Sequence, residues 1–231
     1  MINDASSDDT QQILEKYQRD LRNERVSFAS YYHEGMDEIE RTEHFRFPKK
    51  GRELIILENE KNMGSTPTYN KGFMTCTGEY CTYVASDDIC HPSMISAMVE
   101  ILDSGEADFV YSDMFIVDDN GRILRQFDLP DYNFETCFAN WYLCGVSKLY
   151  RRQLHERFGY YNNDYLANDH ECYLRFAMNG VKFKHIPKVL YSVRAHIDRN
   201  IDVHSPANWA KLIEESKSLV REARLFFRSQ G

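Results

Sequence analysis

The sequence lacks several features that would place it in a particular class of protein. Its 231 residues contain no apolar run near the ~20 residues of a membrane span and no signal-peptide pattern. No two of its six cysteines form a CxxC pair, which argues against a zinc site or a disulfide framework. Internal repeats and low-complexity segments are absent as well. We therefore expect reduced thiols and a cytoplasmic location.

Positive charge is also scarce. The chain has 28 Lys and Arg against 36 Asp and Glu, a net charge of −8. Nucleic-acid binding needs clustered basic residues, so this balance argues against a nucleic acid as partner. A hydrophobic fraction of 42% and an aromatic fraction of 13% fit an ordered globular protein. The length suits one large α/β domain or two small ones.

The most informative stretch is Thr77–Pro92, TGEYCTYVASDDICHP. Residues 80–84 are of types that suit a buried strand, and Pro92 suits the first turn of a helix. Asp87 and Asp88 fall where that strand should end, and ligands bind at the carboxyl ends of strands in open α/β sheets. Paired carboxylates suit Mg²⁺ or Mn²⁺ carrying a substrate phosphate. A solvated turn with an Asp cap explains the pair equally well.

The first part of the chain alternates between short strands and helices. Met1-Ile2 resembles the end of a strand, and the polar loop that follows contains Asp4. Periodicity then predicts, in order, a helix from Asp8 or Asp9, a buried strand over Glu53–Glu58, and a helix over Thr66–Cys76 that contains Asn70 and Lys71. Residues 25–50 are hard to place from the sequence: Val26–Tyr32 could continue a helix, and Met36–Glu43 could form another.

The second part continues this alternation, with one hairpin. The predicted elements are a helix over Pro92–Asp103, a strand over Asp108–Val117, a turn at Asp118–Gly121, a return strand over Arg122–Phe127, a strand over Gly145–Tyr150, a helix over Arg151–Arg157, a helix from Asn168 to Gly180, a strand over Lys182–Tyr191 and a helix from Ser205-Pro206. The aromatic segment between the hairpin and Gly145 is irregular. Asp113 and the rings of Tyr132–Tyr142 are candidates to line an acceptor site, although such rings more often belong to a core.

Several of these motifs occur in one order, and that order is more specific than any single motif. It resembles the large family 2 of inverting glycosyltransferases, which have the A-type, Rossmann-like glycosyltransferase fold with a mostly parallel sheet flanked by helices. The resemblance covers residues 1 to about 197 and rests on the segments NDASSDDT, NMGSTPTYNKG, TGEYCTYVASDD, GYYNNDYLANDHECYLR and YSVRAH.

The resemblance implies a role for individual residues. Asp4 matches the position that contacts the nucleoside of the sugar donor, and Asn70, Lys71 and Ser86 lie in donor-binding segments. Asp87 and Asp88 match the acidic motif that holds the divalent metal, and His196 matches a histidine near the metal or phosphates. Asp169 matches the catalytic base, in an acidic motif that ends at Arg175. On its own, Asp169 can also be interpreted as a simple helix cap.

The chain departs from the family pattern in three places. Ala85 stands where many relatives have an Asp, and Tyr69 stands where a basic residue often precedes the Asn. The family's first strand, first helix and most of its second strand would lie upstream of Met1. We therefore expect the chain as given to be poorly stable and weakly active.

The function that follows is inverting, metal-dependent transfer of a sugar from a nucleotide-diphosphate donor, most plausibly of UDP, to a hydroxyl of a glycan or lipid-linked acceptor. We expect one domain, with residues 1–90 for the donor, 91–200 for the acceptor and catalysis, and 201–231 as a C-terminal helix. One alternative is a non-catalytic binding remnant, which would have no need of Asp169. Another is a nucleotidyltransferase, which usually carries a glycine-rich basic loop that is not seen here.

The C-terminal helix combines an apolar stripe with Lys217, Arg221, Arg224 and Arg228. Such a helix either docks on the core with its charges in water or lies on an anionic membrane as a peripheral contact. Polysaccharide or glycolipid assembly is an expectation from the family alone. The sugar, the acceptor and the oligomeric state are left open.

Overall fold

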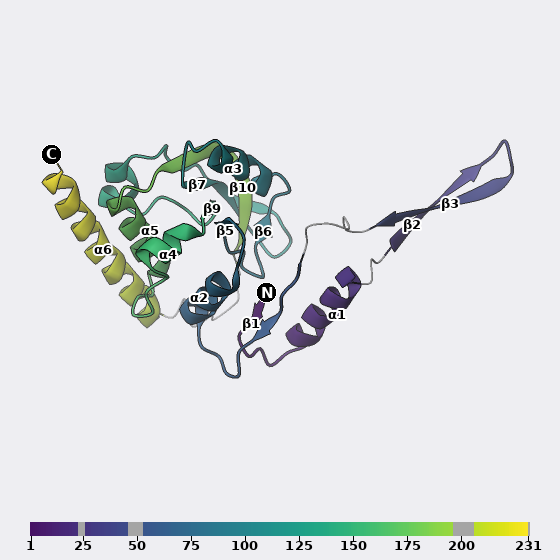
Figure 1. Ribbon diagram of the computed structural model, residues 1–231, viewed down its shortest axis with the longest axis horizontal. Helices are drawn as coiled ribbons and strands as arrows, with labels where there is room; N and C mark the ends of the chain where they lie inside the picture. Colours follow the sequence, from purple (N-terminus) through teal and green to yellow (C-terminus); the bar gives the residue numbers. More distant parts are fainter. Residues whose placement is uncertain (23–25, 46–52, 196–205, 231) are drawn as a thin grey trace. The chain divides into compact units, whose positions relative to one another are not determined.

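The computed structural model describes residues 1–22, 26–45, 53–195 and 206–230 (Figure 1). The chain divides into two compact units, unit 1 over Met1–Thr68 and unit 2 over Tyr69–Gly231. Strands and helices alternate in both, as the sequence predicts for an α/β protein. The His196 position lies outside the described residues.

Unit 1 is built on a short parallel pair of strands. β1 (Ile2–Asn3) pairs with β4 (Leu57–Glu58), and α1 (Thr10–Arg22) lies between them in sequence. The predicted helix start is confirmed, because the side chain and backbone N–H of Thr10 both donate to Asp8. The expected buried strand over Glu53–Glu58 shrinks to two residues because β1 offers only two partners, and Ile55 remains exposed.

A β-hairpin occupies the crossover between α1 and β4. The helices predicted over Val26–Tyr32 and Met36–Glu43 are wrong: the chain forms β2 (Val26–His33) and β3 (Glu38–Phe45), paired residue for residue. The turn explains the difference. Asp37 has a φ of 52°, outside the helical region, and its carboxylate accepts a hydrogen bond from the Tyr32 hydroxyl (2.8 Å).

Unit 2 is organised around a six-stranded sheet. Its order is β5 (Tyr80–Cys81), β9 (Lys148–Arg151), β7 (Phe109–Val117), β10 (Phe183–Arg194), β6 (Ile89–Cys90), with β8 (Ile123–Phe127) also on β7. Parallel pairing, expected for most of the sheet, is confined to β10 with β7 here, and the other pairings are antiparallel. Register shifts between Ile186 and Val189 accommodate Pro187, which cannot donate to a ladder.

Helices cover the sheet of unit 2 on both faces. α3 (Met94–Asp103) packs on β7, β9 and β10. The other helical elements are α2 (Ser65–Thr75), which begins at the end of unit 1, a π-helical turn η1 (Glu135–Asn140), α4 (Gln153–Phe158), α5 (Asn168–Met178) and α6 (Pro206–Ser229). α6 packs on η1 and on α5, along whose outer side it runs in Figure 1.

Strand alternation gives the two faces different cores. On β7, Val110 packs with the apolar residues of α3, whereas Phe109 and Tyr111 point to the opposite, aromatic core. On β9, Leu149 joins the α3 side and Tyr150 joins the aromatic side. The aromatic core includes Phe138 of η1 and the buried face of α5, so the sheet and the following helices are held together chiefly by rings.

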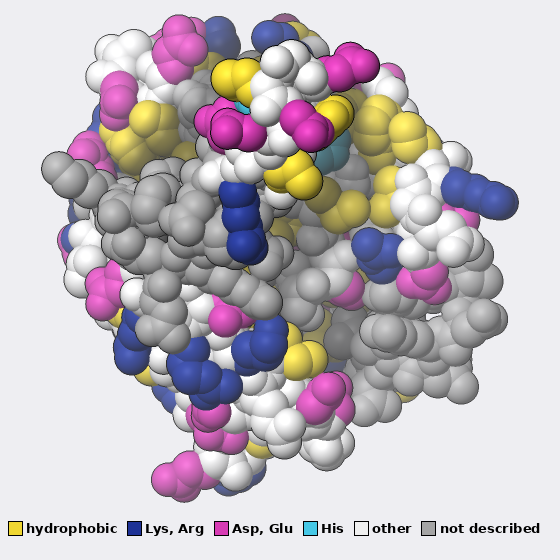
Figure 2. Space-filling model, turned by 90° about the vertical axis from the view of Figure 1, so that its right-hand side faces the viewer, with side chains coloured by type: hydrophobic (Ala, Val, Ile, Leu, Met, Phe, Trp, Pro, Cys, Tyr) yellow, Lys and Arg dark blue, Asp and Glu magenta, His cyan; other side chains and the backbone are white. Residues whose placement is uncertain are grey.

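The C-terminal helix docks on the core of unit 2. Leu219, Val220 and Ala223 are buried, and the Arg224 guanidinium donates to the Ala139 carbonyl (2.7 Å). This is the first of the two alternatives that its sequence allows. The docking of this helix does not test a contact with a membrane. Elsewhere, acidic, basic and hydrophobic side chains are interspersed on the face that Figure 2 shows, and no helix among the described residues is apolar and long enough to cross a bilayer.

Candidate functional site

The predicted metal carboxylate Asp88 is held by the last residues of β10. The Tyr191 hydroxyl donates to one of its oxygens (2.9 Å), and the backbone N–H of Arg194 donates to the other (3.0 Å). The Arg194 guanidinium also donates to the Asp87 carbonyl (3.0 Å), which fixes the acidic turn. Burial raises the pKa of Asp88, although these hydrogen bonds oppose the rise. Each oxygen retains a lone pair for a cation.

The predicted base Asp169 lies in the first turn of α5. Its carboxylate accepts a hydrogen bond from the Tyr142 hydroxyl (3.1 Å) and one from the backbone N–H of His170 (2.8 Å). Burial and the charge of Asp169 raise the pKa of Tyr142 well above its usual value, so this phenol stays protonated and donates. Asp169 is therefore oriented by a residue of the aromatic segment predicted as acceptor lining.

Tyr69 shows that these carboxylates share one environment. Burial raises its pKa, and the negative charges of Asp169, Asp88 and Asp87 raise it further. The Tyr69 ring stacks on Tyr83 with centroids 4.4 Å apart. The predicted base and both predicted metal ligands of unit 2 therefore all act electrostatically on Tyr69, which the sequence analysis noted only as a departure.

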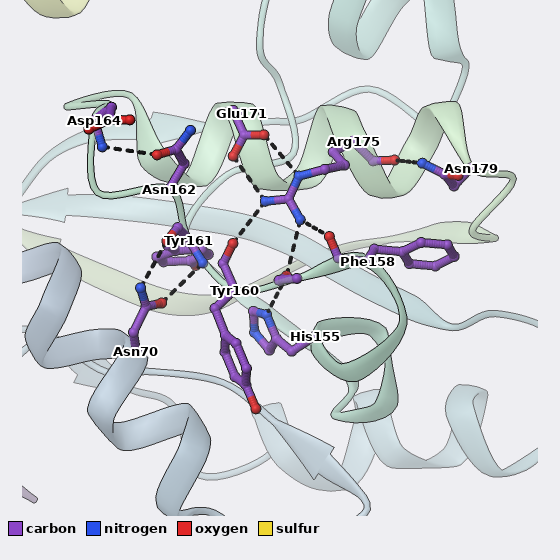
Figure 3. A network of polar contacts seen from close by, with 11 residues as sticks. Asn70, His155, Phe158, Tyr160, Tyr161, Asn162, Asp164, Glu171, Arg175 and Asn179 are labelled. Carbon is purple, nitrogen blue, oxygen red and sulfur yellow. Dashed lines mark hydrogen bonds and ion pairs between the residues drawn. The ribbon is translucent and has the colours of Figure 1, made fainter.

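A helix-bracing network fixes the start of α5 from two sides. In Figure 3 the Arg175 guanidinium binds Glu171 and the carbonyls of Phe158, Gly159 and Tyr160. On the other side, Glu215 of α6 accepts the backbone N–H groups of Leu166 and Ala167 (2.8 and 2.9 Å). Because both ends of the Gly159–Ala167 loop are tied down, Asp169 occupies a defined position.

Asn70, predicted to bind the donor, has a structural role here. Its carboxamide donates to the Tyr161 carbonyl (2.8 Å) and accepts from the Tyr161 N–H (3.0 Å), as Figure 3 shows. It thereby links α2 to the loop before α5. The neighbouring Lys71 is partly buried on α2, and Ser86 is exposed at the acidic turn. Donor contacts of these three residues stay a prediction.

Asp4 belongs to unit 1, where its carboxylate organises a loop. It accepts hydrogen bonds from the Asn59 side chain (2.8 Å) and from the backbone of Met63 (2.9 Å) and Gly64 (3.0 Å). Burial alone would raise the pKa of Asp4, but these hydrogen bonds outweigh it and lower the pKa. The predicted nucleoside contact of Asp4 remains a prediction.

Other residues predicted to line an acceptor site lie partly in the core. Asp113 is buried and accepts hydrogen bonds from the Leu129 N–H (2.8 Å) and the His185 ring (2.8 Å), so it is structural. Cys137, Phe138 and Ala139 are buried as well. Tyr132 and Phe134 line a cavity of about 470 Å³ with the ends of α5 and α6, away from the carboxylates.

Sequence reasoning missed Lys148. This lysine is fully buried on β9, and the charges of Asp169 and Asp88 both act on it. A charged residue two positions before the buried Tyr150, inside a predicted strand, was the available signal.

Mg²⁺ or Mn²⁺ would find part of a ligand set here. Asp87 and Asp88 supply hard oxygen atoms, and the described residues contain no group of three His, Cys, Asp or Glu side chains that would complete a site. Magnesium is commonly bound by one or two carboxylates together with substrate phosphates and water. The residues present therefore fit a metal that arrives with a diphosphate.

Comparison with known proteins decides the family. A model described as Glycosyl transferase family 2 matches residues 40–159, more than half of the 231 residues. The chain belongs to glycosyl transferase family 2. It is similar to the uncharacterized glycosyltransferase YwdF of Bacillus subtilis, at 28% identity over 74% of both chains. It is also similar to the amylovoran biosynthesis glycosyltransferase AmsE of Erwinia amylovora, at 26% identity over 63% of this chain and 56% of that protein.

Solved structures confirm the A-type glycosyltransferase fold for this family-2 chain. S. aureus TarS 1-349 in complex with UDP-GlcNAc has a TM-score of 0.59 and 19% identity, over 86% of this chain and 49% of that one. The mannosyltransferase PcManGT from Pyrobaculum calidifontis, in complex with GDP-Man and Mn²⁺, has a TM-score of 0.56 and 15% identity, over 97% and 53%. The chain spans about half the length of these structures and of the uncharacterized glycosyltransferase MJ1057 of Methanocaldococcus jannaschii, at 23% identity over 64% of this chain and 53% of that protein.

The structural role of Asn70 can be tested by Asn70→Ala. Removing the carboxamide leaves the buried N–H and carbonyl of Tyr161 unpaired, so urea denaturation should show a loss of about 1–3 kcal/mol. The exposed Asn163→Ala should change stability by less than about 0.5 kcal/mol. Unchanged stability together with weakened UDP binding would instead assign Asn70 to the donor.

Proposed function

We propose that this chain is an inverting glycosyltransferase. It transfers a sugar from a nucleotide-diphosphate donor, most plausibly a UDP-sugar, to a hydroxyl of a glycan or lipid-linked acceptor. The observation that supports this most is that two predicted carboxylates are each held in place by hydrogen bonds, Asp88 by Tyr191 and Arg194 and Asp169 by Tyr142. Such an arrangement pairs a carboxylate suited to proton transfer with carboxylates suited to a metal-bound diphosphate.

The proposed roles divide between the two ends of the transferred sugar. Asp87 and Asp88 would hold the divalent cation that accompanies the donor diphosphate, and when bound it would stabilise the negative charge that develops on the leaving group. Asp169, oriented by Tyr142, accepts the proton of the acceptor hydroxyl. The acceptor oxygen then attacks the anomeric carbon from the face opposite the diphosphate. One displacement without an enzyme nucleophile inverts that carbon.

The relatives support the donor class. TarS has been solved with UDP-GlcNAc, and PcManGT with GDP-Man and Mn²⁺. The name of AmsE refers to amylovoran biosynthesis, which agrees with polysaccharide assembly as the setting. The proposal also includes roles predicted from the sequence. Residues 1–90 would bind the donor and residues 91–200 the acceptor, while Asp4 would contact the nucleoside and His196 would lie near the metal. The cytoplasmic location and the peripheral membrane contact stay predictions.

Calorimetric titration of UDP with and without Mn²⁺ tests the metal role. Binding should require Mn²⁺ and disappear in Asp88→Ala, while the exposed Asp164→Ala should bind as the wild type does. The pKa of Asp88 is raised above the 3.8 of an ordinary aspartate. When the pH is lowered, UDP affinity should therefore begin to fall at a higher pH than it would with an ordinary aspartate. Equal binding by Asp88→Ala would remove Asp88 from the donor site.

Asp169→Asn tests catalysis separately from binding. The amide cannot accept the acceptor proton, so turnover should fall by about 10²–10⁴-fold. UDP affinity should stay within about twofold, since the proposed diphosphate ligands are unchanged. Turnover is measured as UDP release across a panel of UDP-sugars and acceptors. If Asp169→Asn keeps the wild-type rate, another residue is the base.

A further inference from the structure

The outer face of α6 carries four cationic side chains in one row. Successive members are four, three and four residues apart, a spacing that places side chains along one line of a helix. The row, called the basic ridge below, consists of the exposed residues Lys217, Arg221, Arg224 and Arg228. The apolar stripe of the same helix is turned into unit 2, where Leu219 and Ala223 are buried. The ridge therefore lies on a face of α6 that the core does not use.

The packing of unit 2 does not account for this concentration of charge. Lys217 forms an ion pair with Glu214 on the same helix (2.6 Å), whereas Arg221 and Arg228 form no ion pair with any residue that the structure describes. Cations three or four residues apart on a helix repel one another and lower its stability. The whole chain has a net charge of −8, so a row of four cations does not follow from its composition either. The ridge thus points to a partner that carries negative charge.

Exposed apolar side chains lie beside the cations. Leu225 is four residues after Arg221 and three before Arg228, so it neighbours both on the helix surface, and its side chain is 69% exposed. Phe227 is three residues after Arg224 and is 42% exposed. The surface of an anionic bilayer matches this combination, because lipid phosphates bind the cations while the acyl boundary takes up leucine and phenylalanine. A nucleic acid or an acidic protein would use the charges alone.

The basic ridge is joined to the segment that precedes the proposed base. The Arg224 guanidinium donates to the carbonyl of Ala139 in η1 (2.7 Å). Three residues further along the chain, the Tyr142 hydroxyl donates to Asp169 (3.1 Å). Three residue steps span at most about 11 Å of backbone. Trp141, which lies between these two contacts, is 41% exposed. A bilayer on the ridge would therefore lie close to the aromatic segment predicted to line the acceptor site.

We propose that the basic ridge, with Leu225 and Phe227 beside it, docks this chain on an anionic lipid bilayer. The contact differs from that of an amphipathic helix lying on a membrane by its apolar stripe, because the stripe of α6 is buried in unit 2. The cations of the ridge bind lipid phosphates, and the two apolar side chains enter the interface. Docking goes beyond sugar transfer and requires neither donor nor acceptor.

Co-sedimentation with vesicles provides the main test. At about 0.1 M salt the chain should bind vesicles of phosphatidylcholine and phosphatidylglycerol in equal parts, and not phosphatidylcholine alone. Arg221→Gln with Arg228→Gln should weaken binding by about 25-fold, since each cation near an anionic surface contributes about fivefold. The control, Lys182→Gln with Lys188→Gln, removes the same charge from exposed positions outside α6 and should bind as the wild type does. Equal binding by the two double variants overturns the proposal.

Leu225→Gln distinguishes a bilayer from another acidic macromolecule. Leu225 is exposed in the free chain, so the substitution should leave the melting temperature unchanged. Binding to the anionic vesicles should weaken by about fivefold, as partial burial of one leucine predicts. Polyglutamate offers the charge without an apolar interior and serves as the comparison. If the chain binds polyglutamate as tightly as the vesicles, and Leu225→Gln affects neither, the ridge serves an acidic macromolecule and the bilayer proposal is overturned.

Thermal unfolding separates docking from a role in the fold. Arg221→Gln with Arg228→Gln removes repulsion along the ridge, so this variant should melt at or above the wild-type temperature. A clear fall in its melting temperature would indicate that the ridge serves the fold.

Tryptophan fluorescence locates the docked surface. The chain has two tryptophans, Trp141 and Trp209, so Trp209→Phe leaves Trp141 as the single reporter. Vesicles that contain brominated lipid should quench Trp141, because its segment is joined to the ridge through Arg224. Emission that stays unquenched while the chain is bound to vesicles would overturn docking through the ridge. Absence of turnover with every donor would instead contradict the glycosyl transfer, so the two failures are distinguishable.

Discussion

The packing of α5 on the aromatic face of the central sheet is the constraint on which the site depends. Phe109 lies between Tyr150, Tyr173 and Phe183, with ring centroids 4.6–5.0 Å apart. Tyr173 belongs to α5, so this ring cluster sets the height of the helix above the sheet. The first turn of that helix carries Asp169. A shift of α5 would separate Asp169 from Tyr142.

Hydrogen bonds to backbone atoms then fix the positions of the segments that ring packing alone leaves variable. Rings stack with broad geometric tolerance, whereas the Arg175 fork meets three carbonyls and Glu171 in one arrangement. Asn70 and Glu215 add directional bonds at the two ends of the loop before α5. Tyr191 and Arg194 likewise hold Asp88 by hydrogen bonds. Both sets of carboxylates are thus oriented by strands and helices rather than by loops alone.

Local signals in the sequence predicted much of this arrangement. The acidic turn after Val84, the helix start at Asn168 and the hairpin at Asp118–Gly121 are each encoded by neighbouring residues, and all three are present. The helical interpretation of the residues of β2 was wrong, because aromatic and small side chains suit a helix and a strand alike. Pairing with β3 decides between the two. The structural contact of Asn70 was not predictable for a related reason. Its partner, Tyr161, is 91 residues away.

Lys148 shows the same limit of prediction from local sequence more clearly. A lysine in a strand is normally interpreted as solvent-exposed, and only the approach of α5, Tyr83 and Asp88 from distant parts of the chain makes it a buried cation. Family resemblance indicated the carboxylates because they belong to a shared pattern. It did not indicate Lys148, whose burial becomes visible only in the structure.

The stereochemistry of the first product tests the central claim most directly. An α-linked UDP-sugar and an acceptor are incubated with the chain, and ¹H NMR records the anomeric coupling of the newly formed glycoside. Inverting transfer with Asp169 as base predicts the β-anomer first, and none from Asp169→Asn. An α-linked first product, or the β-product formed by Asp169→Asn at the wild-type rate, would contradict the account.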